Sequence, residues 1–337
     1  AILMATKVVG PKRWGWLSEH LGHRMRFVRL VAIVSVVTFG GMYWAEGFWS
    51  IALVMILYSF FWNASLPLFE VITFSYLKER VARYAQIRVW GSIGFILTVI
   101  ALGALIDWQG PEFVLPAVLT IFVAIWLSTL LVRDPSPEPH PHTEQSLTLI
   151  LRRPAILGFF AAVFLMQASH GPYYAFYSIF MKDHGYSETL IGQLWALGVL
   201  AEVGLFVIMH HLLDRLGARR VLIASLGLAA LRWVIIGYFA DSLVAVLLAQ
   251  LLHAATFGTF HAAAIHLVHH YFRGRHEGRG QALYSSVSFG AGGAVGSLIA
   301  GYAWAALGPS ITFGTAGAVA ALGAFVAWRF IDSEHDF

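Results

Sequence analysis

Cysteine is absent from this chain of 337 residues, and charged residues make up only 12% of it. The absence of cysteine excludes disulfide bonds and thiolate metal sites. The scarcity of charge, together with 58% hydrophobic residues, excludes an ordinary soluble globular protein. The net charge of +4 does not indicate nucleic-acid binding, because the basic residues lie in short turns between apolar runs. We therefore expect a chain that lies largely in a lipid bilayer.

Apolar runs of membrane-spanning length follow one another along the chain. A helix needs about 20 residues to cross about 30 Å of hydrocarbon. Five such runs precede residue 133, at residues 1–18, 27–45, 50–76, 88–107 and 113–132. Six follow it, at residues 154–181, 187–210, 220–240, 243–270, 281–306 and 309–331. The polar, proline-rich stretch between the two groups cannot continue a helix. We predict two all-α bundles, residues 1–132 and 154–337, joined by a cytoplasmic linker at 133–153.

The first bundle has one run fewer than the second, and the sequence begins inside an apolar run with Ala1. These features predict that a first helix is missing, leaving 11 transmembrane helices by the count of five plus six. Most of the 22 Lys and Arg residues lie in alternate turns, which we expect to face the cytoplasm. Lys7 and Arg232 are exceptions, because both lie within apolar runs.

A polar turn motif occurs twice, with an acid three residues before a glycine and basic residues after it. The two acids are at positions 19 and 214 and the two glycines at 22 and 217, so both pairs differ by 195 residues. Two copies between long apolar runs indicate a duplicated architecture. The motif residues are Gly15, Glu19, Gly22 and Arg24 in the first copy, and Asp214, Gly217, Arg219 and Arg220 in the second.

Charged side chains within the apolar runs mark candidate functional positions. Each costs roughly 2.5 to 3.5 kcal/mol on insertion scales, so such residues usually face a partner or a watery cavity. Glu202 and Arg232 lie about 18 to 20 Å from their shared cytoplasmic turn at 1.5 Å per residue, so they can pair. Glu70 and Arg88 are an acid and a base on adjacent runs. The alternative is that both pairs only hold helices together.

Histidines and aromatic residues suggest two further hypotheses. The run 243–270 contains His253 and a cluster that resembles the histidine boxes of membrane di-iron enzymes. An enzyme of that class needs several boxes on separate segments, whereas only His210–His211 adds a second cluster here. Tyr173 and Tyr174 follow Gly171–Pro172 and are candidates for stacking on a ring-bearing solute, although packing against helices or lipid is the alternative. The clustered histidines are His261, His266, His269 and His270.

The order of these features resembles the major facilitator superfamily, whose members have two six-helix halves and an acid-Gly-basic loop in each half. Residues 63–70, residues 88–95 and Leu252–His253 are similar to the oligosaccharide/proton symporters, the lactose permease group. Closer still is the likeness to the 3-phenylpropionic acid transporter family. That likeness is carried by Tyr173–Tyr174, Gly185–Tyr186–Ser187, Leu194–Trp195, Gly198–Val199, Ala201–Glu202–Val203, Arg232–Trp233 and His253.

The resemblance implies a major facilitator fold of two six-helix bundles and a role for each candidate residue. Asn63, Glu70 and Arg88 match a solute site, to which Tyr173 and Tyr174 contribute ring contacts. Glu202, Arg232 and His253 match a proton-coupling network, and the two polar turns match loops that act in conformational change. Thr256 stands where the permease group has a coupling carboxylate, so Glu202 or His253 would carry the proton instead.

We therefore predict a secondary transporter, not an enzyme, that takes up a small organic solute with protons. The favoured solute is an aromatic carboxylate such as 3-phenylpropionate, because the fork of Arg88 can bind a carboxylate. A sugar or nucleoside/proton symporter and a non-transporting membrane sensor remain as alternatives. We expect a monomer with several membrane passes in the bacterial inner membrane, no cofactor or metal besides the coupling proton, and no nucleic-acid partner.

Overall fold

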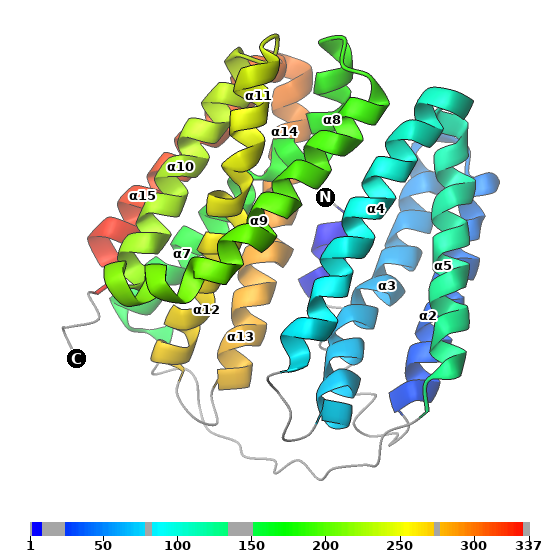
Figure 1. Ribbon diagram of the computed structural model, residues 1–337, viewed down its shortest axis with the longest axis horizontal. Coiled ribbons are helices and arrows are strands. Elements are labelled where there is room, and N and C mark those ends of the chain that lie inside the picture. Colours follow the sequence, from blue (N-terminus) through cyan, green and yellow to red (C-terminus); the bar gives the residue numbers. More distant parts are fainter. Residues whose placement is uncertain (1, 9–23, 78–82, 134–150, 273–276, 333–337) are drawn as a thin grey trace. The chain divides into compact units, whose positions relative to one another are not determined.

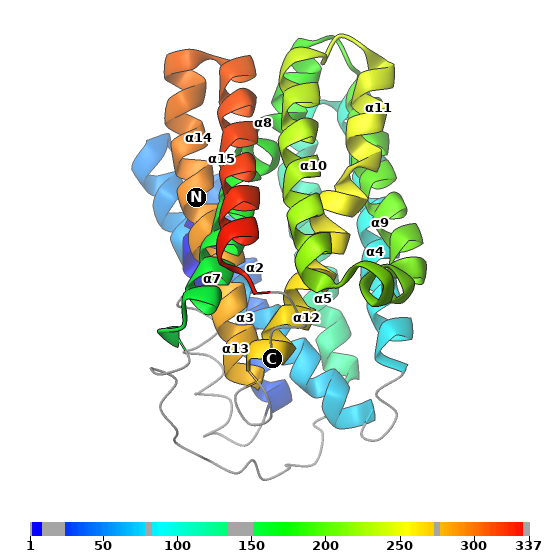
Figure 2. The same ribbon diagram turned by 90° about the vertical axis from the view of Figure 1, so that its left-hand side faces the viewer.

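The computed structural model describes residues 2–8, 24–77, 83–133, 151–272 and 277–332 (Figures 1 and 2). Every regular element within these ranges is a helix, and no strand occurs in them. The prediction of an all-α protein is confirmed.

Ten helices or helix pairs are long and apolar enough to cross a membrane within the described ranges. They confirm all the predicted runs after the first, usually to within a few residues. Of the first run, residues 2–8 are helical, and the remainder lies outside the described residues. The ten spans are Met25–Tyr43, Gly47–Leu77, Gln86–Gln109, Pro111–Leu131, Pro154–Asp183, Glu188–Leu216, Ala218–Tyr238, Leu243–Tyr271, Gly278–Leu307 and Pro309–Phe330.

The helices of the first half are α2 (Arg24–Gly40), α3 (Gly47–Leu77), α4 (Tyr84–Gln109) and α5 (Val114–Leu131), with short 3₁₀ turns at Gly41–Tyr43 and Pro111–Phe113. Gly110 ends α4 with φ of 93°, a conformation that favours glycine, and Pro111 starts the next turn where its missing N–H is not needed.

In the second half, several spans are made of more than one segment. The span Pro154–Asp183 consists of α7 (Pro154–Ser169) and α8 (Gly171–Asp183), which meet at His170. Two further spans contain π-helical turns, at η4 (Ala254–Thr259) between α11 and α12 and at η6 (Ser286–Gly292) between α13 and α14. The other elements are α9 (Glu188–Leu216), α10 (Ala218–Tyr238), α11 (Leu243–Leu251), α12 (Phe260–Tyr271), α13 (Glu277–Ser285), α14 (Gly293–Leu307) and α15 (Pro309–Phe330).

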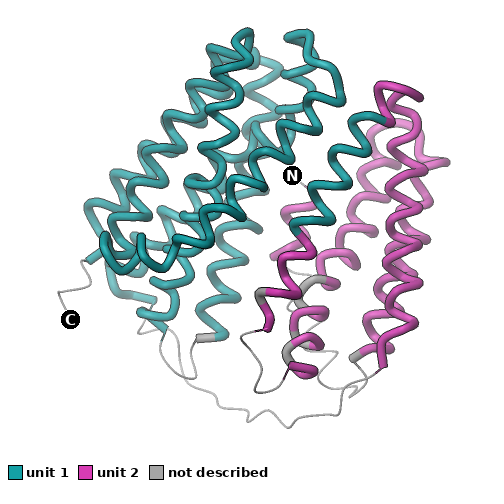
Figure 3. The backbone as a smooth tube through the Cα atoms, in the orientation of Figure 1, with its two compact units in different colours: residues 1, 92–104, 143–337 teal, residues 2–91, 105–142 magenta. Residues whose placement is uncertain are grey.

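The chain forms two compact units (Figure 3). The larger unit contains Ala1, Ser92–Ala104 and Thr143–Phe337, and the smaller unit contains Ile2–Gly91 and Leu105–His142. The predicted linker at 133–153 lies largely outside the described residues, so the predicted domain boundary stays a prediction.

Close helix packing in the larger unit depends on small residues. Gly292 and Gly296 bring the start of α14 against backbone carbonyls of α7, those of Phe164 and Ala168. A side chain at either glycine would overlap these carbonyls, which explains why small residues occupy membrane-helix interfaces. The large side chains of Trp233 and other residues fill the interior between α7, α10 and α15.

Each unit holds the end of its last helix with an arginine. Arg29 of α2 donates from Nη2 to the carbonyl of Val132, at the end of α5, over 2.7 Å. Arg219 of α10 donates from Nε to the carbonyl of Ile331 over 2.7 Å and from Nη2 to that of Trp328 over 2.6 Å. The last carbonyls of a helix lack partners within it and carry partial negative charge, so a guanidinium stabilises them.

Candidate functional site

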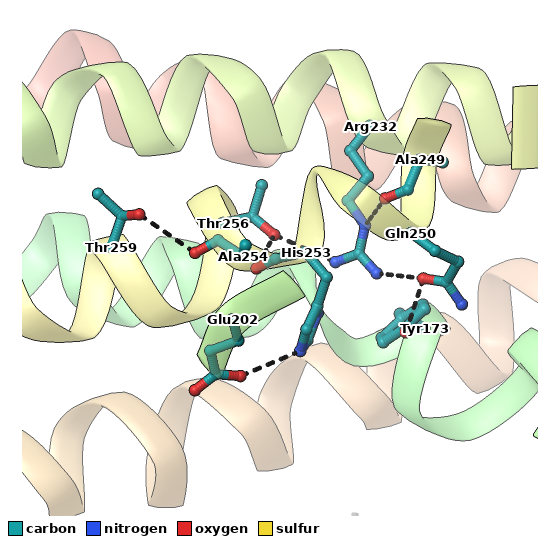
Figure 4. Close-up of polar contacts among 9 residues, drawn as sticks. All are labelled: Tyr173, Glu202, Arg232, Ala249, Gln250, His253, Ala254, Thr256 and Thr259. Atoms are coloured by element: carbon teal, nitrogen blue, oxygen red, sulfur yellow. Dashed lines mark hydrogen bonds and ion pairs between the residues drawn. The ribbon is translucent and has the colours of Figure 1, made fainter. Parts of the chain in front are cut away.

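Arg232, near the middle of α10, is fully buried in the larger unit (Figure 4). Its guanidinium donates hydrogen bonds from all three nitrogens to neutral acceptors. Nε contacts the carbonyl of Ala249 at 2.8 Å, Nη1 contacts Thr256 Oγ1 at 3.1 Å and Nη2 contacts Gln250 Oε1 at 3.0 Å. These three bonds give each nitrogen of the buried cation an acceptor without cancelling its charge.

Aromatic faces cover the same guanidinium. Its Cζ atom lies 4.2 Å from the ring centre of Tyr173 and 4.7 Å from that of Trp233, distances suited to cation–π attraction. Tyr173 also donates its hydroxyl to Gln250 Oε1 at 3.0 Å and packs on Trp195, with ring centres 4.5 Å apart. Gln250 therefore accepts from Tyr173 and Arg232 with one oxygen.

Glu202 and His253 form the adjacent polar pair (Figure 4). Glu202 Oε2 lies 3.7 Å from His253 Nε2, and both side chains are largely buried. Glycine provides the room for this pair, because Gly198 lies against the His253 ring and Gly258 against the Glu202 side chain. The hydroxyl of Thr256 links the pair to Arg232, since it accepts from Nη1 and donates to the carbonyl of His253 at 3.4 Å.

The predicted direct pairing of Glu202 with Arg232 is therefore replaced by a longer connection. Matched depth in the sequence suggested the pair, but the guanidinium of Arg232 bonds to residues of α11 and η4, and Glu202 faces His253. Depth gives a residue's height along a helix and not the direction of its side chain, which explains the difference.

Tyr173 and Tyr174 differ in what they offer a solute. Tyr173 is only 1% exposed, and its ring and hydroxyl are both engaged with the Arg232 network, so it belongs to that network. Tyr174 is partly exposed and stacks on His170, with ring centres 5.7 Å apart. Tyr174 is thus the more exposed of the two rings, and the predicted contact with a solute stays a prediction for both.

His170 and Gln250 are polar members of this cluster that sequence reasoning missed. His170 is fully buried at the break between α7 and α8, and its Nδ1 lies 2.8 Å from the carbonyl of Met166. A carbonyl can only accept, so Nδ1 carries the proton and Nε2 is an acceptor. The sequence signal for both was a polar side chain inside an apolar run, the same signal that drew attention to the charges.

In the smaller unit, a tyrosine joins the predicted acid and base. Tyr84, at the start of α4, donates its hydroxyl to Glu70 Oε1 of α3 at 3.1 Å and also interacts with Arg88. Asn63 lies elsewhere on α3 and donates from Nδ2 to the carbonyl of Leu3 and to Thr6 Oγ1, both at 2.8 Å. Sequence reasoning missed Tyr84, which lies outside the stretches that carried the resemblance.

The structure describes the whole second polar turn motif but only Arg24 of the first. In the second copy, Asp214 lies near the end of α9, Gly217 forms the turn with φ of 75°, and Arg219 and Arg220 begin α10. A positive φ is the reason that the turn requires glycine. In the first copy, Gly15, Glu19 and Gly22 lie outside the described residues; Arg24 begins α2, and its side chain is not described.

The clustered histidines of α12 have different surroundings. His261 Nδ1 lies 2.9 Å from the hydroxyl of Tyr284, whereas His269 and His270 are in the last turn of the helix. Among the described residues, no three His, Asp or Glu side chains gather as a metal site would require. The di-iron alternative therefore has no ligand set in the described part of the chain.

Ten spans of membrane length in the described part of the chain, two units and buried charges within the spans define a multi-pass membrane protein of the transporter class. Comparison with known proteins identifies it further. The chain belongs to the MFS_1 like family of the major facilitator superfamily, whose profile matches residues 1–315. The chain is thus a multi-pass protein of the bacterial inner membrane, as predicted.

Relatives support this class, and solved structures share its fold. The chain is 32% identical to the Probable 3-phenylpropionic acid transporter of Escherichia coli K12, over 83% of this chain and 76% of that protein. It is 28% identical to the maltose permease of Geobacillus stearothermophilus, over 86% and 73%. A mutant of the nucleoside transporter NupG superposes with a TM-score of 0.85 at 16% identity, covering 98% of this chain and 89% of that chain. The human organic anion transporter MFSD10 gives 0.59 at 16% identity, covering 96% and 82%. These two structures share the fold alone.

Proposed function

We propose that this transporter couples uptake of a small organic solute to protons. The observation that carries the proposal is the contact between Glu202 and His253 within the spans, linked through Thr256 to buried Arg232. A carboxylate and an imidazole can each gain or lose a proton, and each change alters the charge near a fixed cation. No cofactor besides the proton is needed for this role.

Protonation of Glu202 removes the negative charge that faces His253, whose carbonyl is linked to Arg232 through the hydroxyl of Thr256. An unbalanced buried cation is costly, so the protonated and unprotonated states favour different arrangements of the surrounding helices. Such a preference is the condition for coupling, because a proton can shift an equilibrium only by its different affinity for the two states. Thr256 cannot take part as a proton carrier, which leaves Glu202 and His253 for this task.

The solute that fits best is an aromatic carboxylate such as 3-phenylpropionate. The E. coli relative is named for this acid, and Arg88 of the smaller unit offers a cation that can bind a carboxylate. The name of the relative supports this solute, and the guanidinium supplies matching chemistry.

Substitution of Glu202 by Gln tests the coupling. In proteoliposomes with an imposed pH gradient, Glu202→Gln should retain exchange of labelled solute and lose uphill uptake, because exchange needs no net proton movement. Glu112→Gln, at an exposed acid next to the α4–α5 turn, is the matched control and should retain both activities. If exchange and uphill uptake fall together in Glu202→Gln, the carboxylate does not couple the proton.

A sugar or nucleoside symporter is the second candidate, because one relative is named a maltose permease and a nucleoside transporter shares the fold. Competition by unlabelled 3-phenylpropionate, maltose and uridine against each labelled compound decides between them. A sensor would bind one of these compounds without moving it across the membrane. Because the family and its relatives are transporters, we propose no enzymatic activity for this chain.

A further inference from the structure

Lys7 is a charged residue in the helical segment 2–8 of the smaller unit, and the coupling network does not include it. Its side chain is partly buried, and no carboxylate of the described residues forms an ion pair with it. A lone cation within a membrane span is unfavourable, and such residues mark substrate or ion pathways. The partner of Lys7 is therefore not a carboxylate of the described residues.

The repeat places Lys7 at the position that corresponds to Glu202. Adding the repeat interval of 195 to 7 gives 202, and each residue stands 12 positions before the acid of its polar turn, at 19 and at 214. At the helical rise of 1.5 Å per residue, twelve residues correspond to about 18 Å, so the sequence spacing predicts a similar depth for both charges. Transporters built from repeats place solute and ion sites near the membrane midplane. The first half has a base where the second half has a proton-binding acid.

The neighbourhood of Lys7 is set by Asn63 of α3. Both amide hydrogens of Asn63 are used, on the carbonyl of Leu3 and on Thr6 Oγ1, each at 2.8 Å. Lys7 follows Thr6 directly and lies one turn after Leu3, so it stands beside this contact. Asn63 Oδ1 keeps its acceptor capacity and suits the ammonium group of Lys7.

Glu70 is the acid on α3, and it already accepts a hydrogen bond away from Lys7. Glu70 lies seven residues after Asn63, about two turns or roughly 10 Å along the helix. It accepts the hydroxyl of Tyr84, which also interacts with Arg88. The charge of Arg88 is thus close to an acid, whereas Lys7 has no described anion. An organic acid would be attracted more to the unbalanced cation.

We propose that Lys7 binds the carboxylate of the solute, and that Asn63 is the positioning residue that orients its ammonium group. This assigns an anion-binding subsite to the smaller unit and selects an organic acid over a neutral sugar or nucleoside. The inference rests on the proposed transport function and moves the carboxylate contact from Arg88 to Lys7.

The test compares an acid with its neutral analogue. Binding of 3-phenylpropionate and of 3-phenylpropionamide, which share ring and chain length, is measured on the purified full chain. Loss of a charge-assisted contact changes affinity about tenfold to a hundredfold. Lys7→Gln should weaken the binding of the acid by that factor and leave the affinity for the amide within about threefold of the wild-type value. Lys7→Arg should retain acid binding, and Lys182→Gln, at a lysine paired with Glu188 outside the site, should change neither.

Asn63→Asp provides a second variant that keeps Lys7 in place. It adds a carboxylate beside the ammonium group, so acid binding should fall at least about tenfold while amide binding persists. The proposal is overturned if Lys7→Gln binds the acid like the wild type, or loses acid and amide equally.

The solute assignment can fail without the subsite failing. If the wild type binds no 3-phenylpropionate, the proposed solute is wrong, and benzoate, hexanoate and inorganic phosphate are tested on the wild type and Lys7→Gln. Binding of any of these anions that is lost in Lys7→Gln supports the subsite. Absence of such binding overturns it.

Discussion

Substitution of Gln250 by Leu tests the arrangement around Arg232 most directly. The amide oxygen accepts from Arg232 Nη2 and from the hydroxyl of Tyr173, both at 3.0 Å, in a fully buried position. Leucine has similar size but no acceptor. The change therefore removes two hydrogen bonds at once and leaves two donors, one of them charged, without this partner.

The expected loss of stability follows from these two bonds. A neutral hydrogen bond contributes about 1 kcal/mol, and one to a charged group about 2 kcal/mol. Gln250 Nε2 has no partner among the described residues, so the substitution also removes an unsatisfied buried donor, and this recovers part of the lost stability. The net expectation is about 2 to 3 kcal/mol in the free energy of unfolding, or roughly 30- to 150-fold in the ratio of folded to unfolded protein.

The measurement is denaturant unfolding of the purified protein in detergent, with Gln193→Leu as the control because Gln193 is exposed on α9. Gln250→Glu adds a second comparison, since its carboxylate neutralises Arg232 and should change the pH dependence of uphill uptake. If Gln250→Leu costs less than about 0.5 kcal/mol, as the surface control should, the two bonds do not hold Arg232 as described.

Two predictions concern stability outside the site. Arg219→Ala removes the cation from the carbonyls at the end of α15 and should lower the free energy of unfolding by about 1 to 2 kcal/mol. Arg220→Ala is the comparison, and an equal loss of stability in both variants would contradict the helix-end role. Gly296→Ala should reduce the amount of folded protein in the membrane sharply, because its methyl group overlaps the carbonyl of Ala168. Gly301→Ala, with nothing within 4 Å, should be tolerated, and similar yields of both variants would show that α7 and α14 do not pack this closely.

The spans were predictable because their signal is one of composition and length. A run of about 20 apolar residues has few structures open to it in lipid other than a helix. The breaks and π-helical turns within the spans were harder to predict from the sequence. The break at His170 follows from Gly171–Pro172, which the sequence shows, but the π-helical turns of η4 and η6 have no comparable marker.

The site was predictable in its charges and not in their partners. The resemblance assigned Glu202 and His253 to one network, and the structure places their side chains 3.7 Å apart, whereas their role in coupling stays a prediction. Gln250 was missed because an uncharged amide in an apolar run costs less than a charge and so attracts less attention. Its role depends on the packing of α10 against α11, which places the amide oxygen within hydrogen-bond distance of Arg232.

The π-helical turn η4 shows why the depth of a residue along a span does not determine which residue it contacts. His253 immediately precedes it, and Thr259 Oγ1 reaches the carbonyl of Ala254, five residues back, at 3.2 Å. A π turn adds a residue to the helix and rotates everything after it relative to an α-helical count. Thr256 lies within this turn, and its hydroxyl contacts both Arg232 and the carbonyl of His253, three residues back. Glu202 fits against the same turn because Gly258 has no side chain. Glu202, His253 and Arg232 are thus joined at an irregular turn, where a small change in helix winding would alter their contacts together.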